Sequence, residues 1–189
     1  MLLSKLAILT EAYMEPHRKY HTLDHITRMF NTARDHKLTL TDEQYIAIWF
    51  HDFIYWPQSQ VNEEMSAQYC VEFLQDHPSF NNYIVEISSS TVARIITDTK
   101  DHIATHSQSG LVIDLDLAGL ADPFWKYMDT GKLIREEYSH LSEEQWIEGR
   151  IKFIKKFLGR KQIYQTAWGV EHFERQAFGN LSAELELWR

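Results

Sequence analysis

The fold is decided by the stretch Thr41-Asp42-Glu43-Gln44-Tyr45-Ile46-Ala47-Ile48-Trp49-Phe50-His51-Asp52-Phe53-Ile54-Tyr55-Trp56. Its first four residues match a capping box, in which a Thr side chain and a Gln side chain three residues later each accept a backbone N–H at a helix start. The apolar residues that follow recur at helical spacing, and Pro57 is expected to end the helix because proline cannot continue it. The stretch therefore predicts a helix over residues 41–56, with the pair His51-Asp52 inside its most apolar part.

Helical patterns dominate the rest of the chain as well. Asn62 is expected to cap a helix that ends at His77-Pro78. A strand over Val92–Thr97 competes with a helix in the serine-rich part of the chain, and residues 103–112 are predicted to form a polar loop. Seven Gly and four Pro are too few for a chain of tight turns, so an all-α fold of roughly eight helices is predicted. The further helices are expected at about 83–99, 115–120, 124–141, 143–158 and 170–188.

Length and charge narrow the class of protein. The 189 residues suffice for one domain with a substantial core, and a formal charge of −8 argues against a protein that grips nucleic acid through its phosphates. The single cysteine, Cys70, lies in an apolar stretch and is expected to be a buried small hydrophobe. The apolar N-terminal run Met1–Leu9 is interrupted by Ser4 and Lys5 and is too short to span a bilayer. A cytoplasmic protein without membrane or nucleic-acid partners is expected, and self-association is left open.

The first candidates for metal binding or catalysis along the chain are two histidines. His21 and His25 are four residues apart, so both rings project from one face if the segment is already helical. The apolar residues after His25, among them Ile26 and Met29, turn this helix towards the core. A histidine that enters the core needs a partner for its ring nitrogens, which is either a metal ion or an ordinary hydrogen bond. Six other histidines have polar neighbours and are expected to be solvated: His17, His36, His77, His106, His140 and His172.

Carboxylates in apolar surroundings complete the group. Burying Asp52 inside residues 48–56 costs several kcal/mol unless a cation or hydrogen bonds compensate it. The run Leu111–Ala118 holds two more carboxylates, Asp114 and Asp116, to which the same argument applies. Two imidazoles and two carboxylates form a mixed nitrogen and oxygen set, which suits Mn, Fe, Co, Ni or Zn better than Ca. Mg is kept as a further candidate.

The order His, His-Asp, Asp resembles the HD superfamily, whose members are all-α metal-dependent phosphohydrolases. The resemblance extends over nearly the whole chain and is closest to a bacterial subfamily of predicted HD phosphohydrolases without an assigned substrate. The motifs that carry it are Tyr20-His21-Thr22-Leu23-Asp24-His25, Trp49-Phe50-His51-Asp52-Phe53-Ile54-Tyr55, Asn62-Glu63-Glu64-Met65-Ser66-Ala67, Thr99-Lys100-Asp101-His102, Asp114-Leu115-Asp116-Leu117, Ile134-Arg135-Glu136-Glu137-Tyr138, Glu148-Gly149-Arg150, Ile163-Tyr164 and Asn180-Leu181.

The resemblance implies a single HD-type helical bundle over residues 1–189, with a metal-site core at about 20–120 and additional C-terminal helices at about 121–189. It implies that His25, His51, Asp52 and Asp116 bind a divalent metal ion. Asp116 is favoured over Asp114 because the last aspartate of HD proteins precedes a Leu-containing helix. Three other residues are candidates to orient a ligand or to bind a second ion: His21, His102 and Asp114.

The implied activity is hydrolysis of a phosphate ester, such as a nucleotide or a related small phosphorylated metabolite, by metal-activated water. Glu63 is the candidate to assist the water together with Asp52, although a first-turn acid that favours its helix dipole is an equally good explanation of Glu63. Substrate phosphate could be contacted by Lys100, Arg135 and Arg150, each of which could equally be a solvated or paired cation.

Two other classes of function stay open. A module that binds metal or nucleotide as a sensor would keep the same ligands, and only turnover distinguishes it from an enzyme. A helical interaction protein would use its His and Asp residues structurally and could bury the stripe Phe173, Ala177, Leu181 and Leu185 against a partner. Packing of that stripe on its own domain is the simpler expectation.

Overall fold

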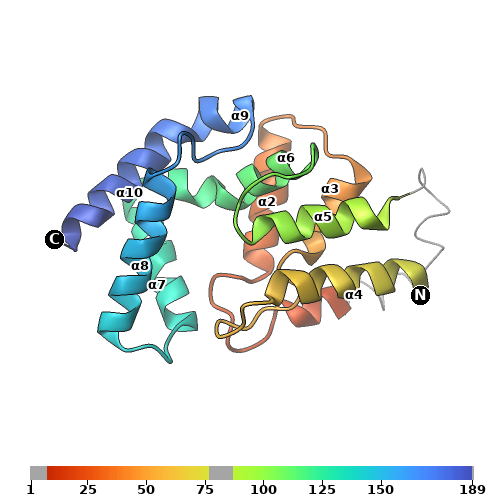
Figure 1. Cartoon of the computed structure of the whole chain (residues 1–189), viewed down its shortest axis with the longest axis horizontal. Coiled ribbons are helices and arrows are strands. Elements are labelled where there is room, and N and C mark those ends of the chain that lie inside the picture. Colours follow the sequence, from red (N-terminus) through yellow and green to blue (C-terminus); the bar gives the residue numbers. More distant parts are fainter. Residues whose placement is uncertain (1–7, 77–86, 189) are drawn as a thin grey trace.

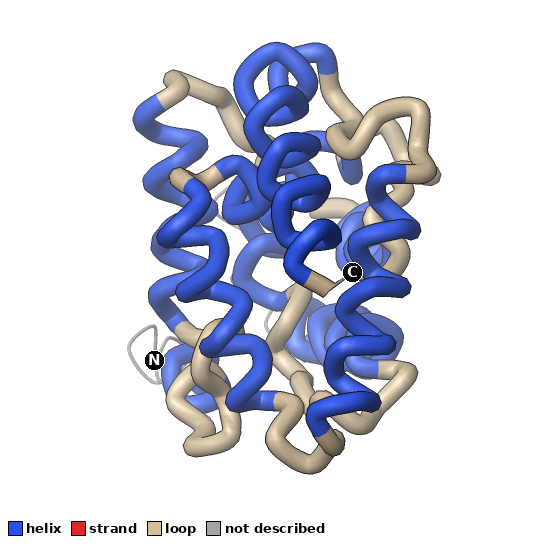
Figure 2. Tube along the Cα trace, turned by 90° about the vertical axis from the view of Figure 1, so that its left-hand side faces the viewer, coloured by secondary structure: helices blue, strands red, loops and turns tan. Residues whose placement is uncertain are grey.

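The computed structural model describes residues 8–76 and 87–188. Within these ranges every regular element is a helix, so the predicted all-α fold is confirmed (Figure 2). Among the described residues, no helix is long and apolar enough to cross a bilayer. After a helical turn at residues 8–12, the elements are α2 (Leu23–Asp35), α3 (Asp42–Phe50), α4 (Asn62–Asp76), α5 (Ser89–Thr99), α6 (Ser109–Asp116), the 3-10 helix η2 (Leu117–Ala121), α7 (Phe124–Glu137), α8 (Glu143–Leu158), α9 (Ala167–Gly169), the π-helix η3 (Val170–Glu174) and α10 (Arg175–Leu187).

Two hydrophobic clusters form the interior, and α6 contributes to both. The first cluster lies among α2 to α6 and includes Val112 and Leu115 of α6. The second lies among α6 to α10 and includes Ile113 of the same helix. Figure 1 places α3, α4 and α5 on one side and α7, α8 and α10 on the other, with α2 and α6 between them. Helix α6, which divides its apolar side chains between the two clusters, therefore joins the two halves.

The capping signals predicted from the sequence are present. Thr41 and Gln44 form a reciprocal capping box at the start of α3, and Ser142 and Gln145 do the same for α8, which Gly159 ends. Each box satisfies backbone N–H groups that the first turn of a helix leaves unpaired. Local sequence therefore decides where these two helices begin.

The helix expected over residues 41–56 ends earlier, at Phe50. The cause is a side chain from elsewhere in the chain, because the Arg18 guanidinium binds the backbone carbonyls of Asp52 and Phe53. These carbonyls are thereby withdrawn from helical pairing, and residues 51–54 form turns. Asn62 is not the expected cap either, since its amide binds both the N–H and the carbonyl of Trp56.

Three further boundaries differ from the expectation. Helix α5 begins at Ser89, capped by Ser88; the alternative strand at 92–97 is wrong, and residues 83–86 of the expected helix lie outside the described residues. The expected loop 103–112 already becomes helical at Ser109, because the apolar run that follows is buried. The helix expected over 124–141 ends at Glu137, and the Arg135 guanidinium binds the carbonyls of Tyr138 and Leu141.

The C-terminal stripe packs on the chain itself, as expected. Ala177 and Leu181 are fully buried in the second cluster, with Phe173 and Leu185 against it. This stripe is therefore not a free surface for a partner. Cys70 is likewise buried, and burial raises the pKa of its thiol to about 12.

We predict that Gly169→Ala destabilises the protein. An added Cβ would lie 2.3 Å from Asp114 Oδ2, and that carboxylate cannot retreat without losing its hydrogen bonds to Gln165 and Thr166. Overpacking of this kind costs about 1–3 kcal/mol. The matched control is Gly179→Ala on α10, whose Cβ would meet nothing within 4 Å and which should gain roughly 0.5–1 kcal/mol from helix propensity. Urea unfolding of both variants measures the difference, and equal stabilities would contradict it.

Candidate functional site

Four ionisable side chains from three helices meet at one point between α2, α3 and α6. His25 lies in the first turn of α2, His51 and Asp52 follow the last residue of α3, and Asp116 ends α6. His25 Nε2 is 3.0 Å from Asp116 Oδ1, and His51 Nε2 is 3.0 Å from Asp52 Oδ2. The two Nε2 atoms are 3.3 Å apart. Residues separated by up to 91 positions in the chain thus present one nitrogen or oxygen atom each to the same small volume.

Part of this group has the geometry of a metal site. One ligand atom each from His25, His51 and Asp52 lies within 4.8 Å of the others. The histidines are almost inaccessible, with exposures of 3% and 1%. A buried set of imidazole nitrogens and a carboxylate could hold a metal ion. Asp116 lies beside it, since its Oδ1 is also 3.7 Å from His51 Nε2.

The outer nitrogens of the two rings differ in their surroundings. His51 Nδ1 donates to the Ile48 carbonyl at 2.9 Å, so the lone pair of the neutral ring is on Nε2 and faces the cluster. His25 Nδ1 is buried and has no hydrogen-bond partner among the described residues. When the His51 ring is neutral, its own helix therefore sets the tautomer that a metal ligand needs.

Charge in the cluster is balanced by a proton. Burial disfavours the charged form of His51, but Asp52 and Asp116 outweigh it and raise the pKa of His51 to about 9. Burial and the neighbouring His51 lower the pKa of His25, although Asp116 opposes this shift. For Asp52 and Asp116 burial is outweighed by the histidines, and both carboxyl pKa values are lowered. Two carboxylates thus enclose positive charge, which is the environment that a bound cation requires.

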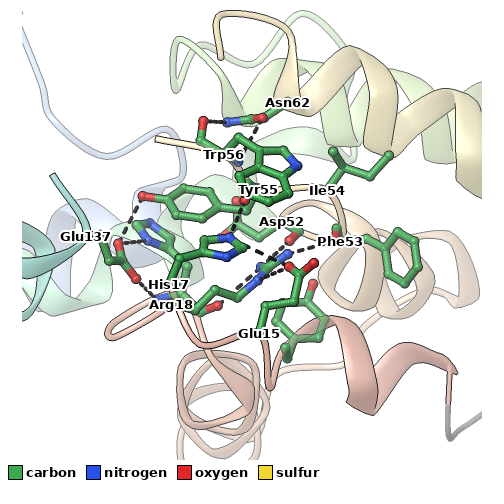
Figure 3. A network of polar contacts seen from close by, with 12 residues as sticks. Glu15, His17, Arg18, Asp52, Phe53, Ile54, Tyr55, Trp56, Asn62 and Glu137 are labelled. Carbon is green, nitrogen blue, oxygen red and sulfur yellow. Dashed lines mark hydrogen bonds and ion pairs between the residues drawn. The ribbon is translucent and has the colours of Figure 1, made fainter. Parts of the chain in front are cut away.

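A buried arginine that the sequence analysis missed holds the backbone around Asp52 (Figure 3). The Arg18 side chain is fully buried. Its Nη1 donates to the carbonyls of Asp52 at 2.6 Å and His21 at 3.2 Å, and its Nη2 donates to Phe53 at 2.8 Å. Glu15 accepts from Nε at 2.9 Å and pairs its charge. The fork of donors fixes two segments 31 positions apart in the relation that the cluster needs.

The rest of the loop after Asp52 is held in the same way. The Asn62 amide binds the N–H and the carbonyl of Trp56, and the Ser66 hydroxyl does so for Ile54. His17 was expected to be solvated, but its Nε2 donates to the Tyr55 carbonyl at 2.8 Å, the contact drawn in Figure 3. Its ring also stacks on Trp56. A loop whose polar backbone groups have so many partners is a rigid support.

His21, a candidate second-shell or second-metal residue, lies at the edge of the cluster in the turn before α2, so it does not share a helical face with His25. Its Nδ1 bonds to Glu137 Oε2 at 2.6 Å, and its ring stacks on Tyr55. The same carboxylate accepts from the Tyr55 hydroxyl and from the backbone N–H of Lys19, Tyr20 and His21. Glu137 therefore orients His21 so that Nε2 is the nitrogen left for other contacts.

Asp114 and His102, the other two candidates of this kind, have different positions. The Asp114 carboxylate is directed to the backbone of Gln165 and Thr166 and to the Thr166 hydroxyl, so it supports a loop of the second cluster and does not orient a metal ligand. His102 Nε2 lies 3.3 Å from Asp116 Oδ2. Its backbone has a positive φ of 53°, a strained conformation for a non-glycine residue, and Arg160 binds its carbonyl.

The predicted phosphate-binding cations are engaged in contacts within the protein. Lys100 Nζ is paired with Glu64 and also donates to the Gln60 carbonyl. The buried Arg150 binds Glu184 and Tyr127, so its role is structural. Arg135, described above, binds the carbonyls that follow α7, and its expected contact with phosphate has no support in this position. Glu63, the candidate water-assisting residue, is half-buried, and burial raises the pKa of its carboxyl group.

A pocket of about 480 Å³ opens from the cluster. It is lined by polar side chains of the cluster and of α4 and by side chains of α7 and α8. Its lining includes His21, His51, Asp52, Glu63, Lys100, His102, Asp116, Ile134, Tyr138, Trp146, Arg150 and Phe153.

Comparison of the chain with protein-family models, with curated proteins and with solved structures finds no match. The function is therefore argued from the side chains of the site and the pocket beside it.

We predict that Glu137→Gln removes a pH-dependent part of the stability. Burial alone would raise the pKa of Glu137, but the hydrogen bond and charge of His21 and the backbone N–H groups lower it from 4.5 to about 2. A carboxyl pKa lowered by folding contributes stability that is complete above pH 4.5 and is lost as the pH falls towards 2. The variant should lose about 2–3 kcal/mol at pH 7 and much less at pH 3. Denaturant unfolding at pH 7, 5 and 3 tests this, and an equal loss at every pH would contradict it.

Proposed function

We propose that this chain is a metal-dependent phosphohydrolase of the HD type, with a divalent ion held by His25, His51, Asp52 and Asp116. The observation that carries the proposal is the convergence of two buried histidines and two partly buried aspartates, two of whose contacts are 3.0 Å long. A structural role alone does not explain why two carboxylates and two imidazoles are enclosed together, because burying ionisable groups costs stability and such clusters are typical of functional sites. The resemblance of the sequence motifs to HD proteins points to the same residues.

The donor set fits a borderline first-row dication. Two imidazole nitrogens and two carboxylate oxygens suit Mn, Fe, Co, Ni or Zn, and Mg is compatible with the carboxylates. The Ile48 carbonyl keeps the His51 ring in the tautomer with Nε2 free to ligate. When bound, such an ion stabilises negative charge on phosphoryl oxygens and makes hydroxide available near neutral pH.

The remaining groups of the chain supply positioning and proton transfer. Glu63 lines the pocket, and a carboxyl group whose pKa is raised by burial is a better proton acceptor than an exposed one. We assign it the role of accepting the proton of the attacking water. His21 is held by Glu137 with Nε2 available, which suits it to contact an oxygen of the substrate. Lys100 lies in the pocket wall beside Glu64 and is assigned a lesser part.

The proposal is tested by elemental analysis and by phosphate release from aryl phosphates and nucleotides with Mn, Co, Ni or Mg added. We predict one ion or more per chain and turnover that depends on it. His51→Ala and Asp52→Ala should lower metal affinity by at least about 100-fold, since even outer partners of metal ligands are worth 10–100-fold, and should abolish turnover.

A matched pair on α6 controls for loss of structure. Asp116→Asn should lose metal and also some stability, because it removes a charged partner of His25. Asp114→Asn should keep the metal but unfold more easily, because its carboxylate supports residues 165–166. Metal without turnover would favour the sensor module over the enzyme. Absence of metal, with both α6 variants equal to the parent in metal binding, would refute the site assignment.

A further inference from the structure

Part of the pocket wall differs in chemistry from the cluster. It is formed by α7, by Tyr138 just after α7 and by α8, and it includes Ile134, Tyr138, Trp146 and Phe153 beside the paired Arg150. None of these is needed to hold a metal ion or to attack a phosphate. This inference rests on the proposed function and concerns what binds between α7 and α8.

Two glycines belong to this part of the pocket wall. Gly131 lies inside α7 and Gly149 inside α8, and both line the pocket. An added Cβ at either position would meet no atom within 4 Å, so packing does not require glycine there. Glycine is also a poor residue for a helix interior compared with alanine. Side-chain volume is thus absent where it would project into the pocket, at a cost to helix stability that the fold does not explain.

The charges of the pocket limit the number of phosphate groups. Its acidic lining residues are Asp52, Glu63 and Asp116, whereas its cations Lys100 and Arg150 are each paired with a glutamate. A divalent ion at the cluster, whose charge Asp52 and Asp116 already offset, would offer a coordination site to one phosphoryl group. A chain of several phosphates would find no further unpaired cation among the described lining residues and would be repelled by the carboxylates.

We propose that the space between α7 and α8 around Gly131 and Gly149 is the binding subsite for the planar, apolar organic part of a substrate that carries a single phosphoryl group. The phosphoryl group binds at the cluster, and the aromatic side chains of the two helices stack on or enclose the organic part. Gly131 and Gly149 are then the residues that set the size of substrate accepted.

The test compares phenylphosphonate with methylphosphonate by titration calorimetry on the Mn-loaded protein. Phenylphosphonate should bind at least about tenfold more tightly because its ring is buried at the subsite. Gly149→Leu and Gly131→Leu should bring the ratio close to one and leave methylphosphonate binding unchanged. The control is Gly179→Leu, an equally open glycine of α10 outside the pocket lining. Its ratio should equal that of the parent.

Thermal unfolding establishes that each leucine variant is folded, and the alanine variants at the same positions give a smaller change of the same sign. Equal binding of the two phosphonates by the parent, or a ratio that persists in both leucine variants, would refute the subsite. Tripolyphosphate that binds more tightly than orthophosphate would refute the limit to one phosphoryl group.

The subsite and the proposed function can fail separately. Binding of 1-naphthol to the metal-free protein, lost in Gly149→Leu but not in Gly179→Leu, reports the subsite without any phosphate. If naphthol binds in this way while neither phosphonate does, the subsite stands and the phosphohydrolase proposal fails. If both phosphonates bind equally and in a metal-dependent manner, the subsite fails while the metal and phosphoryl site of the proposed function stands.

Discussion

Charge enclosed in a protein interior must be balanced, and this constraint organises the centre of the molecule. Against the effect of burial, His51 and His21 keep the pKa of Asp52 low, and His102, His25 and His51 keep that of Asp116 low. His51 in turn holds a proton up to a pKa of about 9 because of the two carboxylates. Removing one partner would leave the others uncompensated, which costs far more than the interaction itself contributes. The cluster is thus a preformed site for positive charge. A bound divalent ion would replace the proton as the charge that compensates the two carboxylates.

The same demand for partners extends to the backbone around the cluster. Once the chain leaves α3 at Phe50, its N–H and carbonyl groups must be paired from elsewhere. Hydrogen bonds from Arg18, Asn62 and Ser66 pair these groups. The Glu137 carboxylate likewise accepts hydrogen bonds from three backbone N–H groups of the turn before α2. The positions of the candidate ligands therefore depend on side chains that do not touch the cluster.

The charged cluster and the side chains that pair the backbone around it differ in how far they can be predicted from the sequence. Capping boxes at Thr41 and Ser142 are local signals, and an Asp inside an apolar run indicates buried charge wherever the chain goes. Arg18 has no such signal, since its partners are carbonyls 34 and 35 positions away and any arginine could provide them. For the same reason the helix end at Phe50 was predicted too late. Asp114 and Asp116 illustrate an intermediate case: two positions on a helix diverge by roughly 200°, so only one can face the cluster, but packing decides which.

The two aspartates of α6 contact different halves of the molecule. Asp116 faces the cluster, while Asp114 binds residues 165–166 beside the second hydrophobic cluster. The pocket combines both halves, since its lining comes from the elements up to α6 and from α7 and α8. Helix α6 with η2, together with the contacts of Glu137 to residues 19–21 and Tyr55, thus fixes the α7–α8 wall relative to the candidate ligands. Under the proposed function, chemistry and selectivity would reside on separate helices, and the α7–α8 wall could change in size without altering the four candidate ligands.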